Sequence, residues 1–385
     1  MNFKTQLEDY QATQSMSKFP YSFEEWEAMA KKVLSSPNYD YVAAGAGSED
    51  TMRENVDAFK RWRIQPRMFR DVEQRDTTTT ILGTQLESPI MMAPVGVQKI
   101  LHERGDLASA KAAGELGVPF VCSTVSAYSL EEIAAEVGED TLKWFQLYWS
   151  TDEQITSSLL KRAEAAGYSA IVVTLDTPMV GWRERDLNHR WLPFLEGIGI
   201  ANYISDPVFK SRMSVDPGSD LQAAGEEFRK VFGNTKLSWR DLEFVREQTS
   251  LPIILKGILH PHDAELAIHY GVDGVIVSNH GGRQVNGAIS AIDALPEIAE
   301  VVQGQIPVLM DSGIRRGDDV LKALALGAEA VLVGRPYLYG LAVGGREGVK
   351  QILRNLKGDF ELTMALSGVK QISEITPALI RKTTN

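Results

Sequence analysis

The stretch Ser278-Asn-His-Gly-Gly-Arg-Gln284 follows directly after the apolar run Gly274-Val-Ile-Val277. A histidine can accept a proton near neutral pH, and the planar guanidinium of an arginine can hold a carboxylate or phosphate through two parallel hydrogen bonds. His280 and Arg283 are separated only by two glycines. The stretch therefore indicates a base and an anion-binding group at the end of a buried strand.

The elements that must position this stretch repeat along the chain. From about residue 88, eight short apolar or β-branched runs alternate with longer amphipathic segments. Apolar strands with helical crossovers predict a parallel sheet covered by helices, and eight such pairs predict a closed TIM (β/α)8 barrel of the α/β class. The expected strands are 89–93, 119–122, 144–147, 170–175, 252–256, 274–278, 307–311 and 330–334. The clearest expected helices are 106–116, 152–166, 261–270 and 318–326.

We expect a single domain over residues 1–385, because barrels of this kind run longer than the ~150 residues of an average domain. Residues 181–237 interrupt the barrel between its fourth and fifth strands. A connection of this length is usually a lid, a binding loop or an assembly surface. The other expected parts are an N-terminal extension 1–87, with helices near 22–34 and 51–62, the barrel 88–360 and a C-terminal segment 361–385.

Composition narrows the class of partner and the location. A formal charge of −11 argues against nucleic acid or an anionic membrane surface as the main partner, because both select a basic face. The N-terminal residues lack the basic start and apolar core of a signal peptide, and no apolar run approaches the ~18 residues of a membrane helix. These features predict a soluble cytoplasmic protein. The single cysteine, Cys122, is expected to be a buried inert thiol. His260 and His262 are close together, but no cluster of Cys, Asp or Glu completes a metal site, so no metal is expected.

In such a barrel the active site lies at the carboxyl ends of the strands. Strands seven and eight end in Asp311-Ser-Gly-Ile-Arg315 and Gly334-Arg335, where glycine N–H groups and two guanidiniums would bind a phosphate. A phosphorylated ligand is expected, but the absence of GxxxxGK[ST] and of a strand-to-helix GxGxxG argues against P-loop or Rossmann nucleotide binding. The residues expected to converge at the other strand ends are Pro94, Val95, Gly96, Ser123, Thr124, Gln146, Tyr148, Thr174, Asp176, Lys256, Ser278, His280 and Arg283.

Four stretches together resemble the FMN-dependent α-hydroxy-acid oxidase and dehydrogenase family. They are residues 278–284, Asp311-Ser-Gly-Ile-Arg-Arg-Gly317, Leu175-Asp-Thr-Pro178 followed by Arg183, and Asp40-Tyr-Val-Ala-Ala-Gly45. The similarity extends from about residue 21 to residue 380, and it is greatest to the lactate 2-monooxygenases, whose long segment between strands four and five resembles 181–237. The resemblance implies FMN as the cofactor, a small 2-hydroxy acid and O2 as reactants, and a homotetramer or homo-octamer.

The resemblance also implies a role for the substrate-facing residues. Oxidation of a 2-hydroxy acid needs a base, a carboxylate anchor and an electron sink. His280 is the implied base, and Asp176 is the implied carboxylate that orients and stabilises its imidazole. The two arginines suit a carboxylate anchor because their planar forks match its geometry. The implied substrate-binding residues are Arg183, Arg283, Tyr41, Tyr148 and Gly96, and both tyrosines are also expected to take part in catalysis.

A second set of residues is expected to hold FMN. Lys256 would place a positive charge beside flavin N1 and O2, although a strand-end lysine could instead form a Schiff base or a buried structural ion pair. Gly96 stands where the resemblance implies alanine for the oxidases and glycine for the monooxygenases. The other expected cofactor contacts are Pro94, Val95, Gly96, Ser123, Gln146, Thr174, Ser278, Asp311, Gly313, Arg315, Gly334 and Arg335.

Four functions stay open at this point. The leading one is a lactate 2-monooxygenase that converts L-lactate, or a similarly small L-2-hydroxy acid, and O2 to acetate, CO2 and water. The second is an L-lactate or 2-hydroxy-acid oxidase that releases pyruvate and H2O2. The third is a flavin-free phosphosugar isomerase or aldolase with Lys256 as the nucleophile, and the last is a non-catalytic binding protein. The substrate side chain, the oligomer size and the role of residues 181–237 are not fixed by the sequence.

Overall fold

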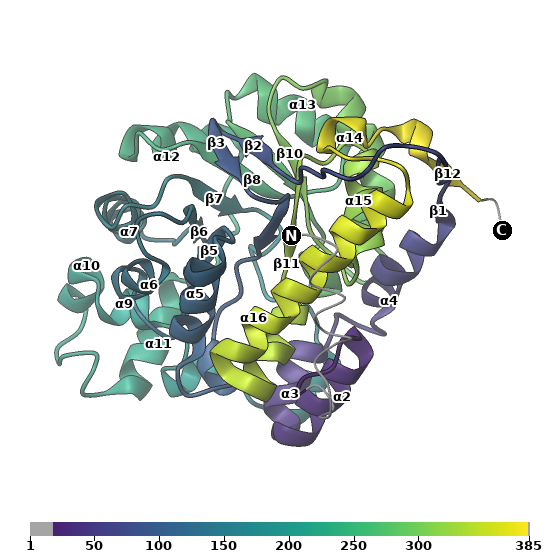
Figure 1. Cartoon of the computed structure of the whole chain (residues 1–385). Helices are drawn as coiled ribbons and strands as arrows, with labels where there is room; N and C mark the ends of the chain where they lie inside the picture. Colours follow the sequence, from purple (N-terminus) through teal and green to yellow (C-terminus); the bar gives the residue numbers. More distant parts are fainter. Residues whose placement is uncertain (1–17, 384–385) are drawn as a thin grey trace.

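The structure is a computed structural model that describes residues 18–383. Eight parallel strands within this range form a closed barrel, and helices surround it, as Figure 1 shows. The predicted TIM barrel is therefore confirmed. In chain order the barrel strands are β4 (Ile90–Met92), β5 (Phe120–Ser123), β6 (Lys143–Leu147), β7 (Ile171–Thr174), β8 (Ile253–Ile258), β9 (Gly274–Val277), β10 (Val308–Met310) and β11 (Ala330–Val333).

The four helices predicted by range are present, and several outer helices begin at polar caps. Ser129 forms a capping box with Glu132, and the Asp152 carboxylate accepts two backbone N–H groups at the start of its helix. The last helix runs to Leu366, past the expected barrel end at residue 360, and is broken by non-helical backbone at Gly344 and Gly345. The outer helices are α5 (Gly105–Leu116), α6 (Leu130–Val137), α7 (Glu153–Ala165), α12 (Leu242–Gln248), α13 (Pro261–His269), α14 (Ala291–Val302), α15 (Gly317–Ala325) and α16 (Arg335–Leu366).

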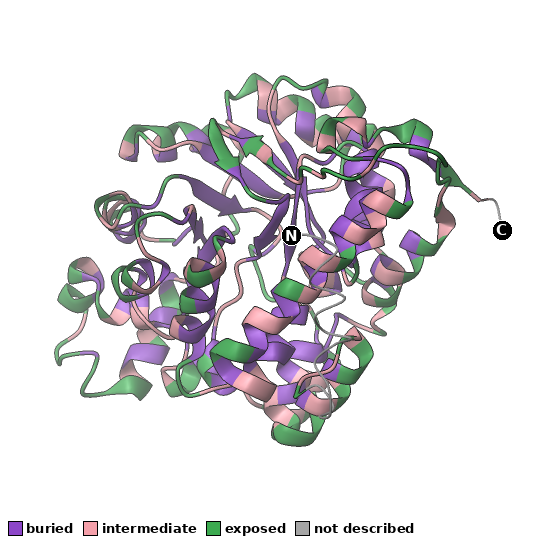
Figure 2. Cartoon of the chain, viewed as in Figure 1, coloured by how far each residue is buried: buried purple, intermediate pink, exposed green. Residues whose placement is uncertain are grey.

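The barrel interior is a packed core and not a channel. Side chains such as Met91, Trp144 and Ile276 fill it, and Figure 2 shows the barrel strands almost entirely in the colour of buried residues. Ile81 and Leu86 join the same hydrophobic cluster from a hairpin of β2 (Thr79–Ile81) and β3 (Thr84–Leu86). Polar groups are therefore excluded from the interior and gather where the strands end.

The N-terminal extension contains α2 (Phe23–Val33), α3 (Ser36–Ala43) and α4 (Asp50–Asp57), followed by β1 (Trp62–Ile64). The two predicted helices are present, and α3 is an additional one. β1 pairs antiparallel with β12 (Ile380–Lys382) near the C-terminus, which ties the two ends of the described chain together. The extension packs on α16 and carries Tyr41, on α3, to the barrel.

Residues 181–237 form a folded unit between β7 and β8. It contains α8 (Glu184–His189), α9 (Ala201–Ile204), α10 (Pro207–Ser211) and α11 (Leu221–Val231), of which the last three lie at the lower left of Figure 1. Buried aromatic rings hold it together; Tyr203 and Phe228, for example, have ring centroids 4.8 Å apart. Asn202 fixes it to the barrel, because its side-chain amide donates to Thr124 O at 2.9 Å and accepts from Leu130 N at 2.7 Å.

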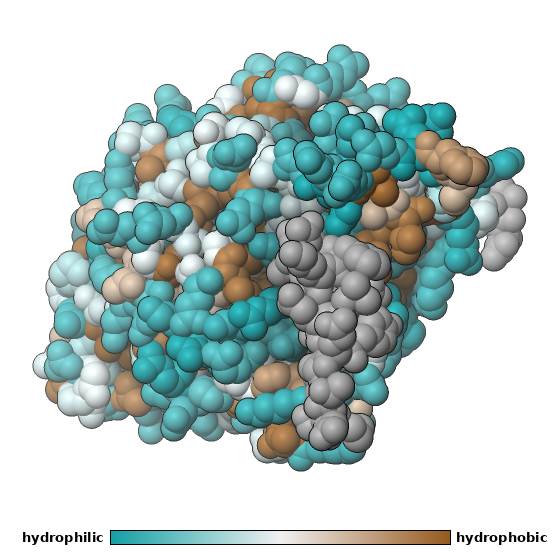
Figure 3. Space-filling view, in the orientation of Figure 1, coloured by the Kyte–Doolittle hydropathy of each residue, from teal (hydrophilic) through white to brown (hydrophobic). Residues whose placement is uncertain are grey.

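Hydrophobic residues on the face shown in Figure 3 occur in small groups separated by hydrophilic ones. Among the described residues, no helix has the length and apolar character required to cross a membrane. Cys122 is buried, as expected, and burial raises the pKa of its thiol to about 12, which makes it unreactive.

Candidate active site

The main cavity lies at the carboxyl ends of the barrel strands. Most of the predicted site residues line it together, although they come from seven of the eight strand ends, from α3 and from the β7–α8 connection. Four predicted residues lie behind the wall, each in contact with a wall residue: Asp176, Ser123, Thr124 and Ser278. The predicted residues in the wall are Tyr41, Pro94, Val95, Gly96, Gln146, Tyr148, Thr174, Arg183, Lys256, His280, Arg283, Asp311, Gly313, Arg315, Gly334 and Arg335.

His280 follows β9 and is held on two sides. Its Nδ1 lies 2.8 Å from Oδ1 of Asp176 and 3.3 Å from Oγ1 of Thr177, and its Nε2 lies 3.5 Å from the hydroxyl of Tyr148. His280 and Lys256 hold the pKa of Asp176 below its usual value, although burial alone would raise it. An ionised carboxylate only accepts hydrogen bonds, so Nδ1 carries the proton and Nε2 is left as the proton acceptor. Burial keeps the pKa of His280 below its usual value despite the nearby carboxylate.

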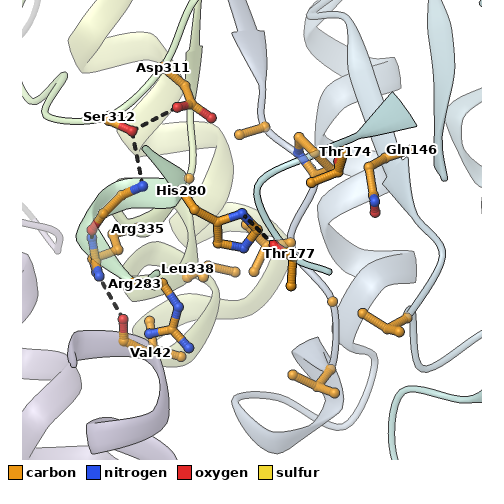
Figure 4. A pocket seen from close by; sticks show the side chains of 18 of the residues that line it. Val42, Gln146, Thr174, Thr177, His280, Arg283, Asp311, Ser312, Arg335 and Leu338 are labelled. Carbon is orange, nitrogen blue, oxygen red and sulfur yellow. Dashed lines mark hydrogen bonds between the residues drawn. The ribbon is translucent and has the colours of Figure 1, made fainter. Parts of the chain in front are cut away.

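The glycines after His280 serve close packing. An added Cβ at Gly282 would lie 2.5 Å from both N and Cα of Met52, on α4. His280, Gly281 and Gly282 all have positive φ, so the chain makes a tight left-handed turn that aims the imidazole into the cavity. Gly281 N donates to Ser312 Oγ at 2.9 Å, which fixes the turn to the end of β10 (Figure 4).

Two guanidiniums face the same space as the imidazole; Arg183 is buried and Arg283 is partly buried. Arg283 donates to Ala44 O at 2.7 Å and lies over the Tyr41 ring, 5.3 Å from its centroid. Arg183 is 7% exposed and donates to Arg283 O at 3.2 Å, and its nearest carboxylate, on Asp186, is 3.9 Å away. Burial, together with the charges of Arg183 and Arg335, lowers the pKa of Arg283 to about 9. Two neighbouring cations that are shielded from solvent at least in part and have no close carboxylate favour an anionic ligand between them.

Lys256 lies deeper, at the end of β8, and is 3% exposed. Its Nζ is 3.0 Å from Oδ2 of Asp311 and 2.8 Å from Oγ of Ser278. Burial alone would lower the pKa of Lys256, but Asp311 and Asp176 raise it above its usual value. A lysine that stays protonated is a poor amine nucleophile, so the geometry favours a fixed positive charge over a Schiff base.

The cavity fits FMN, as unsatisfied polar atoms in its wall show. Among the described residues, Gln146 Nε2, Thr174 Oγ1 and Arg315 Nε are buried without a hydrogen-bond partner. Buried polar atoms are normally paired, so these three mark places where a ligand donates or accepts. Ser123 orients the Gln146 amide by donating to its Oε1 at 3.2 Å. Figure 4 shows Gln146 and Thr174 on one side of His280 and Arg335 on the other.

The opposite end of the cavity is suited to a phosphate. Burial, with the nearby charge of Arg335, lowers the pKa of Arg315 to about 10, so both guanidiniums gain from a bound anion. The backbone at Gly313 has φ +97°, and an added Cβ would lie 2.1 Å from Asn55 O. Only glycine fits there, at the turn that carries Arg315. Gln146, Thr174 and Lys256 would hold the flavin ring, and Arg315 and Arg335 the phosphate.

Two residues with a clear positioning role had no predicted role. Gln284 donates from Nε2 to Asp176 O at 2.6 Å and to Met179 O at 2.9 Å, and its Oε1 accepts from Arg183 at 3.2 Å. It therefore joins the base and anchor segments. Thr177 donates to Asp176 Oδ1 at 3.0 Å. Their positions could have indicated these roles, because Gln284 directly follows Arg283 and Thr177 directly follows Asp176 in the sequence.

The two neighbouring histidines have structural roles in the described chain. The His260 side chain caps α13 by accepting from His262 N, and His262 lies 2.9 Å from Glu265. Residues 18–383 contain no group of three or more His, Cys, Asp or Glu side chains placed to hold a metal ion.

A barrel that combines an oriented imidazole, two arginines suited to a carboxylate and a cavity that fits FMN is typical of an FMN-dependent α-hydroxy-acid oxidoreductase. The sequence matches the FMN-dependent dehydrogenase family over residues 30–382, and the chain belongs to this family and uses FMN. It is 45% identical over 355 residues to an L-lactate oxidase of Lysinibacillus sphaericus, covering 92% of this chain and 91% of that one. It is 42% identical to human 2-hydroxyacid oxidase 1, covering 93% and 95%. A crystal structure of mandelate oxidase superposes with a TM-score of 0.84 at 39% identity, over 95% of this chain and 99% of that one.

Proposed function

We propose that the protein oxidises L-lactate, or a similarly small L-2-hydroxy acid, with O2 as the second substrate. This proposal rests mainly on one observation: Tyr148, His280, Arg183 and Arg283 face the same cavity as the residues suited to hold the flavin ring. The arginines would hold the substrate carboxylate, which places the neighbouring hydroxyl near His280 Nε2. L-Lactate oxidase is also the name of relatives from Lysinibacillus sphaericus and Nostoc, at 45% and 43% identity.

The residues account for the movement of protons and charge. His280 Nε2 takes the hydroxyl proton, and Asp176 stabilises the imidazolium that forms. The α-hydrogen leaves with its electron pair, for which bound FMN supplies the acceptor. Lys256 would place its positive charge beside the bound ring and so favour uptake of negative charge there. Tyr148 stays a hydroxyl donor, since burial and Asp176 raise its pKa.

The product proposal is the monooxygenase outcome, in which L-lactate and O2 give acetate, CO2 and water. It requires that pyruvate stay bound until O2 has reacted. The packed unit of residues 181–237 supports such retention, because Phe194 and Phe232 from this unit line the cavity. The oxidase outcome, pyruvate and H2O2, is the second candidate, and the names of the relatives favour it.

One measurement separates the two outcomes. The FMN-loaded enzyme is supplied with L-lactate under air, and acetate, pyruvate and H2O2 are quantified together. We expect about one acetate per O2 and little free peroxide. Stoichiometric pyruvate and H2O2 would establish the oxidase instead, and no consumption of L-lactate or any other small 2-hydroxy acid would refute both. D-Lactate is the matched control and should not react.

We also propose a homotetramer or homo-octamer and a cytoplasmic location. Light scattering coupled to size exclusion tests the first, and fractionation of the source cells tests the second. A monomer in solution would contradict the assembly proposal without affecting the chemistry.

A further inference from the structure

A second cavity lies directly behind one wall of the active site. It has a volume of about 270 Å3 and shares Val180, Phe194 and Phe232 with the active-site lining. Its remaining wall includes Met179, Leu195 and Phe228 together with Arg229, so it is mainly apolar, and it opens to the surface where Met179 and Leu195 are exposed. We call this second cavity the annex. For comparison, an apolar cavity of ~150 Å3 is enough to hold benzene.

Phe232 separates the annex from the reacting groups. Its ring packs edge-on against Tyr148, with centroids 5.4 Å apart, and the Tyr148 hydroxyl is 3.5 Å from His280 Nε2. On its other side the Phe232 ring is 4.8 Å from that of Phe228. Phe232 is thus one side chain away from the base and touches the annex wall as well.

The backbone at Phe232 is anchored independently of its ring. Phe232 is the C-cap of α11, and its N–H donates to Phe228 O. The preceding carbonyl, Val231 O, accepts from Thr151 N and from Ser150 Oγ, both at 2.9 Å. Asn234 donates to Ser150 O at 3.2 Å. Removing the ring should therefore leave this segment in place, next to the loop that carries Tyr148.

The other two residues shared by both linings, Phe194 and Val180, are less suited than Phe232 to close the passage between the two cavities. Phe194 is buried, and an added Cβ on the neighbouring Gly199 would lie only 3.1 Å from its ring, so it is fixed by packing. Val180 is smaller and 49% exposed. Phe232 alone combines a large ring, partial burial and contact with Tyr148.

We propose that Phe232 sets the maximum length of the substrate side chain by closing the annex, and that the annex accepts the unbranched alkyl chain of longer 2-hydroxy acids when the ring is removed. This inference rests on the proposed function, because it assigns the substrate side chain to the Phe232 side of the cavity. On this proposal, a single residue, Phe232, accounts for a preference for substrates with a methyl side chain. Each buried methylene is worth about a fourfold gain in affinity, so opening the annex has a measurable effect.

The test compares FMN-loaded Phe232→Ala and Phe232→Leu with the parent. Leu195→Ala is the matched control, because Leu195 lines the annex but not the active site and is 46% exposed. Two quantities are measured: the kcat/KM ratio of 2-hydroxyoctanoate to L-lactate, and the Kd ratio of 2-oxooctanoate to pyruvate from changes in flavin absorbance. We expect both preferences to shift toward the longer acid by at least about tenfold in Phe232→Ala, less in Phe232→Leu, and not in Leu195→Ala.

Unchanged ratios in both Phe232 variants would overturn the inference, as would an equal shift in Leu195→Ala. A parent that already prefers 2-hydroxyoctanoate would also overturn it, because the annex would then be open. If the parent oxidises no 2-hydroxy acid, the proposed function fails, and the Kd ratio still tests whether Phe232 closes the annex.

Discussion

Nδ1 of His280 lies 2.8 Å from Oδ1 of Asp176, and the second oxygen of this carboxylate, Oδ2, is buried without a hydrogen-bond partner in the part of the chain that the structure describes. Oδ1 of Asp176 is the oxygen that meets the imidazole, and it also accepts from Thr177 Oγ1 at 3.0 Å. The pair fixes which nitrogen carries the proton and aims Nε2 into the cavity.

Replacing His280 should separate chemistry from cofactor binding. His280→Gln removes the base, so the rate of flavin reduction by L-lactate should fall by about 10² to 10⁴. FMN should stay bound, because Arg315 and Arg335 lie at other strand ends. Stopped-flow absorbance and the flavin-to-protein ratio measure the two effects. A reduction rate close to that of the parent would remove His280 from the role of base.

The pH dependence follows from the direction of the His280 pKa. Burial lowers it from 6.5, so the imidazole is neutral and able to accept a proton down to a pH below that value. The acidic limb of kcat/KM should therefore lie below pH 6.5, with activity lost as pH falls. Asp176 raises the pKa of His280, so Asp176→Asn should move this limb to still lower pH and reduce the maximal rate. A limb that moves to higher pH would contradict the pairing.

Arg283→Met should weaken substrate binding by roughly 2 to 5 kcal/mol, because it removes one of the two guanidiniums proposed to hold the substrate carboxylate. Arg283→Lys should restore only part of this, since an ammonium cannot reproduce the two parallel hydrogen bonds of a guanidinium. The measurement is the substrate Kd from rapid flavin reduction. Arg316→Met serves as the control, because Arg316 is exposed and pairs with Glu24. An unchanged Kd in Arg283→Met would place the carboxylate elsewhere.

Arg315→Met should release FMN. Nε of Arg315 is buried and has no partner among the described residues, so its binding partner is expected to be the cofactor phosphate. Loss of a charge-assisted hydrogen bond of ~1.5 to 3 kcal/mol raises the Kd for FMN by tenfold or more. The flavin-to-protein ratio after gel filtration reports this. Full retention of FMN in Arg315→Met would exclude Arg315 as a phosphate ligand, and the adjacent Arg316→Met should retain FMN.

Gly96→Ala should shift the products from acetate and CO2 toward pyruvate and H2O2 while flavin reduction continues. The added methyl occupies space beside the flavin and the substrate, and it also disturbs packing. Its Cβ would lie 2.4 Å from Val125 O, so the loop after β5 must move. This overpacking should cost about 1 to 3 kcal/mol of unfolding free energy. Product analysis and thermal unfolding are measured together. An unchanged acetate yield in a correctly folded variant would show that Gly96 serves packing alone.

The sequence by itself determined the barrel and most of the residues that line its main cavity. The apolar runs were long enough to identify all eight strands, because strands buried on both faces carry few polar residues. Once the strands form a parallel barrel, the residues that follow them must meet at one end, which brings His280, Lys256 and Arg335 together.

The shorter elements depended on the tertiary structure. The β2–β3 hairpin has strands of three residues each, too short for an alternating pattern to stand out. Helix α3 buries Tyr39, Tyr41, Val42 and Ala43 against several neighbours, so it has no clear polar and apolar faces in the sequence. Tertiary contacts alone explain why Tyr41 reaches the site.

Contacts between residues far apart in the chain were decided by the fold alone. The link from Gln284 to Asp176, the ion pair of Lys256 with Asp311 and the plug formed by Phe232 against Tyr148 each join segments that local patterns treat separately. Side-chain type and spacing report burial and secondary structure, because these depend on near neighbours. Distances across the barrel depend on how every strand and loop packs, and so they are fixed only when the whole chain has folded.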